Sequence, residues 1–310
     1  MEEMDLDELL RRARELSRKR FGKKIILCLP GMFLVDGKRG RYPAISITGG
    51  SCGLGCDHCK GKILEPMLRV SSPRELVELC LKLEGEGALG CLVTGGSDSS
   101  GRLPWDKFIG AIGEVKAKTN LMVSVHSGMV GESTARAFKD VGVDQVLVEA
   151  IGSRETFREV MHLEEGERLL LETLDSLYGA DLKVAPHIVA GIHGGRILGE
   201  RRAMEILSQY PVDLLVWVAF MPLRETPMAR CQPASPKEVA RLIAESRLLF
   251  PEATIALGCA RPRGRLRLEL ERLAMEAGVQ RVGLYSEDSV RLARDLGLEV
   301  EFRETCCSMS

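Results

Sequence analysis

Eight short apolar runs alternate with amphipathic helical patterns along most of this 310-residue chain. Strands that alternate with helices predict parallel βα units, and eight such units can close into an α/β TIM-type barrel, a (βα)8 barrel. A doubly wound open sheet is the competing arrangement. The runs are Ala44–Thr48, Cys91–Thr94, Leu121–Val125, Gln145–Val148, Leu182–His187, Leu214–Phe220, Thr254–Leu257 and Val279–Leu284. The helical patterns lie near residues 73–84, 105–118, 131–141, 165–178, 198–209, 236–249, 265–277 and 286–296.

No low-complexity segment or linker divides the chain. We therefore expect one barrel domain at 44–297. An N-terminal helical extension at 1–43 precedes it, and a C-terminal tail at 298–310 carries two further cysteines.

The net charge of −1 argues against a nucleic-acid or membrane-surface partner. The chain has no apolar run of about 20 residues and no signal-peptide pattern. Ten cysteines without a secretion signal indicate a reducing, cytoplasmic location, where they serve as metal ligands or buried thiols.

Cys52, Cys56 and Cys59 stand in one loop after the first predicted strand, with three and then two residues between them. Three thiolates can hold three irons of a 4Fe–4S cubane and leave the fourth iron open, whereas structural sites close with four ligands. The loop therefore predicts an iron–sulfur enzyme with an external ligand. A zinc knuckle with a distant fourth ligand is the alternative.

This spacing, at this place in a barrel, resembles the signature of the radical S-adenosylmethionine (SAM) superfamily. The resemblance implies that SAM chelates the open iron. It also implies that reductive cleavage of SAM releases a 5′-deoxyadenosyl radical, which abstracts hydrogen from an unactivated carbon. His58 occupies the position before the third cysteine, where the family usually has an aromatic residue.

Other strand ends resemble the SAM-binding segments of this family. Thr94, Gly95, Gly96 and Ser97 follow the second strand, where the family holds the amino group of SAM, although Gly-Gly alone often means a turn. Glu149 suits ribose hydroxyls, and the nearby Ser153 equally suits a helix cap. His187 lies in a segment, Pro186–Gly195, that resembles the family's adenine-packing strand. Arg261 suits the SAM carboxylate or an acidic carrier domain, and solvated loop charge is the alternative for it.

Seven further cysteines remain, and they suggest a second cluster. Cys80 and Cys91 fit buried thiols. Adjacent cysteines on a tail are poor core material and an oxidation liability, so Cys306 and Cys307 are easier to explain as metal ligands. We predict a second 4Fe–4S cluster held by Cys231, Cys259, Cys306 and Cys307, with Cys28 in reserve.

From about residue 44 to residue 297 the chain resembles biotin synthase-like radical SAM proteins. The terminal Cys306-Cys307-Ser308 resembles components of the two-protein, archaeal-type lipoyl synthase system. That resemblance implies first-sulfur insertion into an octanoyl chain on a carrier domain. The partners it implies are an octanoylated carrier domain, a second radical SAM component and a ferredoxin-type electron donor. A radical SAM enzyme of another reaction, a noncatalytic metal-binding module and a maturation or scaffold subunit remain as alternatives.

Overall fold

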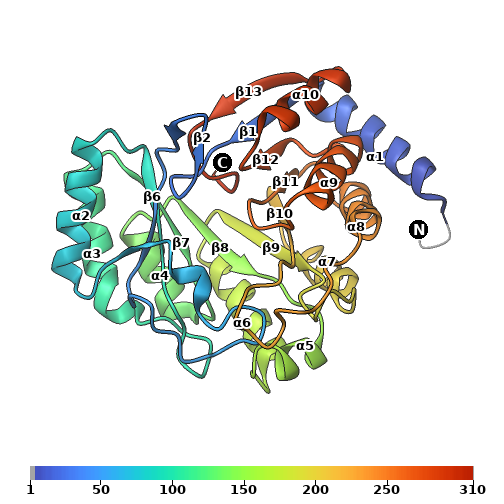
Figure 1. Ribbon diagram of the computed structural model, residues 1–310. Coiled ribbons are helices and arrows are strands. Elements are labelled where there is room, and N and C mark those ends of the chain that lie inside the picture. The colour runs from blue at the N-terminus through green and yellow to red at the C-terminus, as the bar shows by residue number, and fades with distance from the viewer. Residues whose placement is uncertain (1–3, 310) are drawn as a thin grey trace.

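The computed structural model describes residues 4–309 and shows a curled parallel sheet with helices packed around it (Figure 1). The strands of this sheet are β1 (Lys24–Cys28), β4 (Ala44–Ser46), β5 (Leu68–Arg69), β6 (Gly90–Thr94), β7 (Met122–His126), β8 (Gln145–Glu149), β9 (Val184–Ala190), β10 (Leu214–Ala219), β11 (Thr254–Leu257), β12 (Arg281–Gly283) and β13 (Glu299–Arg303). A separate two-stranded antiparallel sheet joins β2 (Leu34–Val35) to β3 (Lys38–Arg39).

The helices are α1 (Leu6–Phe21), α2 (Pro73–Gly85), α3 (Trp105–Lys118), α4 (Glu132–Asp140), α5 (Arg154–Glu159), α6 (Gly166–Gly179), α7 (Glu200–Leu207), α8 (Pro236–Leu249), α9 (Arg265–Glu276) and α10 (Glu287–Asp295), with a short 3-10 helix, η1 (Lys62–Leu64). Their starts follow local capping chemistry. Ser72 and Ser235 accept hydrogen bonds from backbone N–H groups in the first turns of α2 and α8, and proline follows each serine. None of the helices in residues 4–309 is long and apolar enough to cross a lipid bilayer.

The strand order is β13-β1-β12-β11-β10-β9-β8-β7-β6-β4-β5. The eight predicted strands, β4 and β6 to β12, therefore stand side by side in chain order, and each pair is parallel. A doubly wound sheet reverses its order at a switch point, and this run of eight strands has no reversal. The predicted TIM-type barrel is confirmed, in an open form whose sheet has β13 and β5 at its two margins.

Three strands of this sheet, β1, β5 and β13, lie outside the eight predicted ones. β1 pairs with β12 and with β13, so the segments before residue 44 and after residue 297 both extend the barrel sheet. Arg41 links the two sides of the opening through its backbone. Its N–H donates to Glu304 O at 2.8 Å, and its carbonyl accepts from Leu89 N at 2.8 Å.

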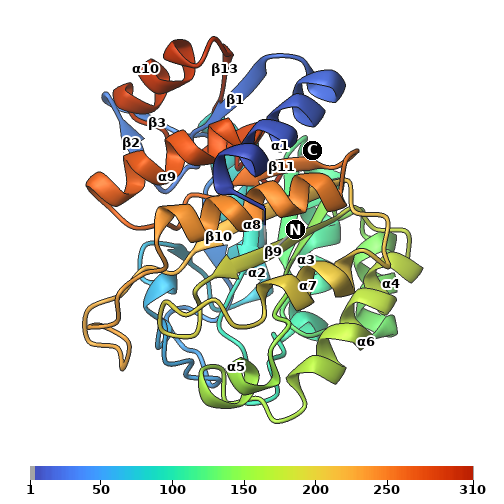
Figure 2. The same cartoon turned by 90° about the vertical axis from the view of Figure 1, so that its right-hand side faces the viewer.

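The main apolar core lies between the sheet and the helices, and a smaller apolar cluster fills the inside of the curl. Trp217 of β10 is fully buried, and its Nε1 donates to Ser246 Oγ of α8 at 2.9 Å. α1, which lies in the predicted N-terminal helical extension, packs against α8 and α9 on the outside (Figure 2). The inner cluster consists of Cys28, Leu147, Ala185, Leu214, Val216, Ala256 and Cys307.

The segment after β13 turns into the barrel, and the C-terminal end lies between the strands on the two sides of the opening (Figure 1). Arg281 of β12 donates through Nη1 to Cys307 O at 3.2 Å and also to Met309 O. The Tyr42 hydroxyl lies 2.9 Å from Ser124 Oγ and 3.0 Å from Met309 Sδ. These contacts fix the tail inside the curled sheet, where Cys307 belongs to the inner cluster and Cys306 packs against it.

Candidate active site

The three-cysteine loop follows β4 directly and rests on the loop that follows β6. Gly96 N donates to Thr48 Oγ1 at 2.7 Å, and Gly53 N donates to Ser97 O at 2.6 Å. A Cβ atom on Gly96 would lie 2.0 Å from Ser51 O and 2.6 Å from Cys52 Cβ. Only glycine allows this approach, so the glycine pair predicted to bind SAM also holds the cysteine loop in place.

Within the loop, the Cys56 thiol shares a hydrogen bond with Cys59, and His58 lies next to both. The hydrogen bond with Cys56, together with one from His58, lowers the pKa of Cys59. Burial opposes this effect but does not cancel it. The same hydrogen bond raises the pKa of Cys56, so one thiolate is shared by this pair, and the thiolate is the form of cysteine that binds iron.

A cleft of about 1000 Å³ opens above the loop. Its polar lining includes the three cysteines, the segment from Thr94 to Ser97, His126 and Glu149. Its apolar lining includes Leu54, Leu103, Met129, Val148, Met161 and Leu163. The structure thus brings the first cysteine group, the glycine pair and Glu149 to one cleft at the carboxyl ends of the strands, where barrel enzymes place their active sites.

The residues of this cleft fit a 4Fe–4S cluster and SAM. Three sulfur donors come from one loop, and the glycine backbone leaves room beside them. His58 Nδ1 is buried and has no hydrogen-bond partner in residues 4–309, so a bound cofactor could satisfy it. Asp98 is engaged within its own turn, because its Oδ1 accepts hydrogen bonds from Ser100 N and Arg102 N at 2.8 and 3.0 Å.

Glu149 ends β8 and is the register partner of His187, which lies in the middle of β9, and His126 ends the neighbouring strand β7. The rings of His126 and His187 lie 5.7 Å apart. Burial and the neighbouring His126 lower the pKa of His187 to about 3, so this imidazole is neutral. His187 Nδ1 lies 2.9 Å from Ala185 O. The cleft lining includes His126, which the sequence analysis missed, but it does not include His187.

Two strand-end residues have roles in the fold. Ser153 Oγ accepts a hydrogen bond from Thr156 N at 3.1 Å, so it caps α5, as the alternative interpretation proposed. Arg261 is buried and donates to the carbonyls of Gly258, Gly283 and Leu284, and it pairs with Glu271 of α9. The Arg261 guanidinium is thus occupied away from the cleft, and the structure gives no support to its predicted contact with SAM.

A second group of cysteines meets inside the barrel. Cys28 ends β1, Cys259 follows β11, and Cys306 and Cys307 follow β13. Burial, followed by the nearby Cys306, raises the pKa of Cys28 to about 12 and that of Cys259 to about 11. The hydrogen bond from Cys307 and a further one from Ser308 lower the pKa of Cys306. Ser308 Oγ lies 3.0 Å from Cys306 Sγ.

Two neighbours from β12 shape this inner group. Gly283 makes room for it, because a Cβ there would lie 3.0 Å from Cys259 N and 3.1 Å from Cys307 Sγ. Arg281 places a half-buried positive charge beside the sulfurs, and its buried Nε has no partner in the described part of the chain. Four thiols, space between them and a nearby cation fit an anionic iron–sulfur cluster.

The remaining cysteines lie elsewhere. Cys231 Sγ would lie 3.4 Å from a Cβ on Gly194, in the loop after β9, and it is not among the main electrostatic neighbours of Cys28, Cys259 or Cys307. The structure therefore groups Cys28, the reserve candidate, with Cys259, Cys306 and Cys307, and it leaves Cys231 outside. Cys80 and Cys91 are buried with their sulfurs 4.0 Å apart, as expected for packed thiols.

Sulfur spacing bears on the kind of metal. Within residues 4–309 no three cysteine sulfurs lie within 4.8 Å of one another. A zinc ion with bonds of about 2.3 Å would hold its sulfurs roughly 3.8 Å apart. Among the described residues, neither cysteine group therefore has the compact set of three sulfurs that a single zinc ion requires.

A parallel barrel with a three-cysteine loop and a cleft at the carboxyl ends of its strands is the architecture of a cofactor-dependent barrel enzyme. The Radical SAM superfamily matches residues 46–209, which is more than half of the chain. The chain belongs to the radical SAM superfamily. Membership implies the 4Fe–4S cluster and SAM that the cysteine loop predicted.

Curated relatives support the predicted likeness to biotin synthases. The chain is 25% identical to the biotin synthase of Halorhodospira halophila across 99% of this chain and 93% of that protein. It is 26% identical to the biotin synthase of Hyphomonas neptunium across 73% of this chain and 72% of that protein. These relatives confirm a biotin synthase-like protein at low identity.

Solved structures show the same fold. Methylornithine synthase superposes with a TM-score of 0.67 at 17% identity, covering 96% of this chain and 90% of that one. HydG, a maturase of the [FeFe]-hydrogenase, gives a TM-score of 0.69 at 15% identity, covering 96% of this chain and 68% of that one. At these identities the likeness describes the fold and carries no reaction.

Proposed function

We propose that this protein is a radical SAM sulfurtransferase that inserts sulfur into an octanoyl chain on a lipoyl carrier domain, in the biosynthesis of the lipoyl cofactor. The observation that carries this proposal is the group of four cysteines inside the barrel. Insertion of sulfur needs a sulfur source close to the substrate, and a second iron–sulfur cluster on Cys28, Cys259, Cys306 and Cys307 would be such a source.

The chemistry of the substrate fits a radical cofactor. An unactivated C–H bond has no useful acidity, so acid–base residues cannot break it, and the protein contributes positioning and the exclusion of water. When bound, the cofactors would supply a hydrogen-abstracting 5′-deoxyadenosyl radical and a sulfide that replaces the abstracted hydrogen on carbon. The apolar wall of the cleft, which includes Leu103, Met129 and Leu163, suits an alkyl chain.

In this proposal, different residues of the cleft bind the cluster and SAM. Cys52, Cys56 and Cys59 hold the first cluster. Thr94 to Ser97 and Glu149 bind SAM at the ends of β6 and β8. Relative to the set predicted from the sequence, Cys28 replaces Cys231 in the second cluster. These roles account for all the described cysteines except Cys80, Cys91 and Cys231.

The partners in this proposal are an octanoylated carrier domain, a second radical SAM component and a ferredoxin-type electron donor, all in the cytoplasm. This chain would attach the first sulfur, at the terminal carbon. The competing reactions are methylation, rearrangement and biotin-type sulfur insertion by another biotin synthase-like enzyme.

Anaerobic reconstitution tests the proposal. The reconstituted protein is incubated with SAM, a reductant and an octanoyl-lysyl peptide, and the peptide mass is measured. A product heavier by one sulfur supports the proposal. Formation of 5′-deoxyadenosine without sulfur gain overturns it in favour of another radical SAM reaction.

Variants then separate the two ligand sets. Cys28→Ala should lower iron and sulfide per chain and stop sulfur gain, while Cys231→Ala should leave both unchanged. The opposite pattern would restore Cys231 to the second cluster.

A further inference from the structure

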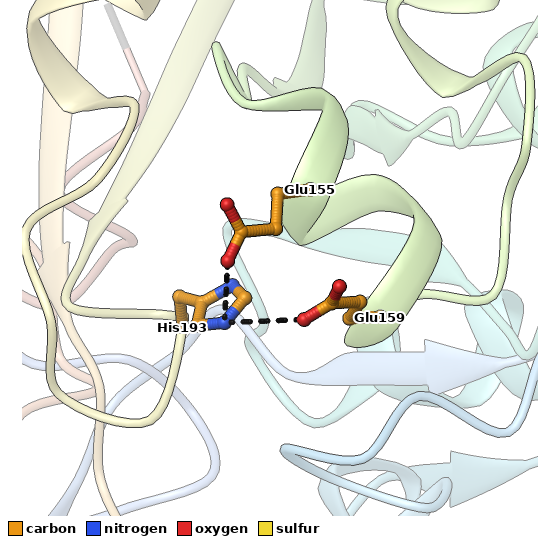
Figure 3. A group of neighbouring side chains, drawn as sticks. All are labelled: Glu155, Glu159 and His193. Atoms are coloured by element: carbon orange, nitrogen blue, oxygen red, sulfur yellow. Dashed lines mark ion pairs between the residues drawn. The ribbon is translucent and has the colours of Figure 1, made fainter.

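Glu155 and Glu159 of α5 and His193 of the loop after β9 point their ligand atoms toward one another (Figure 3). His193 Nε2 lies 3.7 Å from Glu155 Oε1 and 3.8 Å from Glu159 Oε2. In the described part of the chain this is the one group of three such side chains whose ligand atoms all lie within 4.8 Å of one another. We propose that Glu155, Glu159 and His193 bind one divalent transition-metal ion, separate from the iron–sulfur chemistry.

The imidazole of His193 is held in the orientation that a metal ligand needs. Its side chain is only 12% exposed, and its Nδ1 lies 3.1 Å from the hydroxyl of the buried Thr156. Metal-binding histidines commonly donate their second ring nitrogen to an oxygen in this way, which fixes the ring and its tautomer. With the proton on Nδ1, the Nε2 lone pair faces the two carboxylates.

The spacing leaves room for an ion. Separations of 3.7 and 3.8 Å are too long for hydrogen bonds between His193 and the carboxylates. A tetrahedral ion with bonds of about 2.1 Å places its ligand atoms roughly 3.4 Å apart. The two distances to His193 therefore exceed this spacing by only a few tenths of an ångström, and the two carboxylate oxygens lie within 4.8 Å of each other. One imidazole with two carboxylates suits Mn²⁺, Fe²⁺, Co²⁺ or Zn²⁺.

Neighbouring cations leave the ligand atoms accessible. Arg158 donates to Glu159 Oε1 at 2.8 Å, whereas Oε2 is the atom that faces His193. Arg154 Nε donates a hydrogen bond to Glu167 Oε2 of α6 at 2.6 Å. Arg196 also acts on Glu159 through its charge. The positive charges of Arg158 and Arg196 partly offset the negative charge of Glu159, so a metal ion must compete with them for this carboxylate.

A bound ion would connect the loop after β9 to the wall of the cleft. The chain beyond α5 contacts the cysteine loop, because Asp57 N donates to Val160 O at 2.8 Å. Asp57 Oδ1 also lies 3.0 Å from His162 Nε2. Fastening α5 to His193 would therefore stiffen the support of the three-cysteine loop.

Titration with Mn²⁺ tests the site, because the EPR signal of free Mn²⁺ is lost on binding and thiols compete poorly for this ion. The cluster-loaded protein in its oxidised, EPR-silent state should bind one Mn²⁺ per chain. Glu155→Gln/Glu159→Gln and His193→Gln should each weaken binding at least about tenfold, and Thr156→Val should weaken it by about 10–100-fold through the imidazole.

The matched control is Glu164→Gln/Glu172→Gln, which removes two exposed carboxylates from the same region and should leave Mn²⁺ affinity unchanged. Mn²⁺ should also raise the melting temperature of the wild-type protein but not that of the Glu155→Gln/Glu159→Gln variant. Absence of stoichiometric binding, or equal affinity in that variant and the wild type, would overturn the proposal. If the double variant does not fold, His193→Gln and Thr156→Val decide the matter alone.

Discussion

Cys52, Cys56 and Cys59 come from a single loop after β4, whereas the inner group comes from three places in the chain. Cys28 ends β1, Cys259 follows β11, and Cys306 and Cys307 follow β13. Loop closure costs about (3/2)RT ln n, so joining residues across nearly the whole chain costs roughly 3 kcal/mol more than joining them within one short loop. Packing of the barrel offsets that difference for the inner group. The first group therefore depends on local geometry, while the second depends on the complete fold.

Removing one cysteine from each group should give the largest and most divergent effects. Cys59→Ala should abolish 5′-deoxyadenosine formation, because two thiolates cannot hold the open cluster. Cys307→Ala should retain this activity and lose only the iron of the proposed second cluster. Iron analysis and chromatography of the nucleoside check both, and loss of SAM cleavage in Cys307→Ala would show that the groups are not independent.

Alanine at the two supporting glycines should separate the groups in the same way, with smaller effects. Gly96→Ala meets backbone atoms at 2.0 Å, so we expect a loss of SAM affinity of at least about tenfold and destabilisation by about 1–3 kcal/mol. Gly283→Ala meets Cys259 N and Cys307 Sγ at 3.0 and 3.1 Å, so it should lower iron in the inner group alone.

The control for this pair is Gly110→Ala in α3, where nothing lies within 4 Å of the added Cβ. Alanine there should stabilise the helix by about 0.5–1 kcal/mol. We compare the three variants by their SAM affinity, their iron content and the denaturant concentration at which half of the protein is unfolded. Equal loss of SAM affinity in Gly96→Ala and Gly283→Ala would contradict the separate roles of the two glycines.

Substitution of Arg281 tests how strongly this residue holds the C-terminal tail in place. Arg281→Met removes the donors to Cys307 O and Met309 O and should cost about 1–3 kcal/mol of unfolding free energy. It should also speed iron release from the inner group, measured with a chelator, and leave release from the first group unchanged. Arg281→Lys should restore part of the iron retention, and identical release rates in all three proteins would contradict the anchor role.

A pH-dependent effect is expected from His187 of β9, a strand that lies between those carrying the two groups. Its pKa is about 3 in the folded protein, against about 6.5 when unfolded. The unfolded chain thus binds the extra proton below pH 6.5, so this contribution to stability is present above that pH and declines toward pH 3. Between pH 7 and pH 5 the free energy of unfolding of the wild type should fall by about 2 kcal/mol more than that of His187→Gln. Urea unfolding at the two pH values measures both. Equal decreases in the two proteins would contradict this role of His187.

The same contrast explains how much the sequence could predict. The eight strands, their helices and the first cysteine group were predictable because each depends on periodicity or spacing within a short window. The sequence did not place Cys28 in the inner group, because β1 was not among the predicted strands. Its inward direction follows from alternation with Ile25 and Leu27, which point into the outer core.

Arg261 and His126 show the other limit of the sequence. Arg261 has the right charge beside the cleft, but Glu271, on a different element, turns it away. His126 carries no motif, and its place in the cleft comes from the curl of the sheet. Side-chain direction at these positions is set by distant residues, and local patterns do not record it.

The distribution of the inner cysteines along the chain has a consequence for synthesis. The first group is complete once residue 59 has emerged, whereas the inner group waits for Cys307. At translation rates of about 5–20 residues per second, roughly 10–50 s separate the two events. Cys28 therefore remains without the other cysteines of its group until the tail has been made, whereas the three cysteines of the first group are made together.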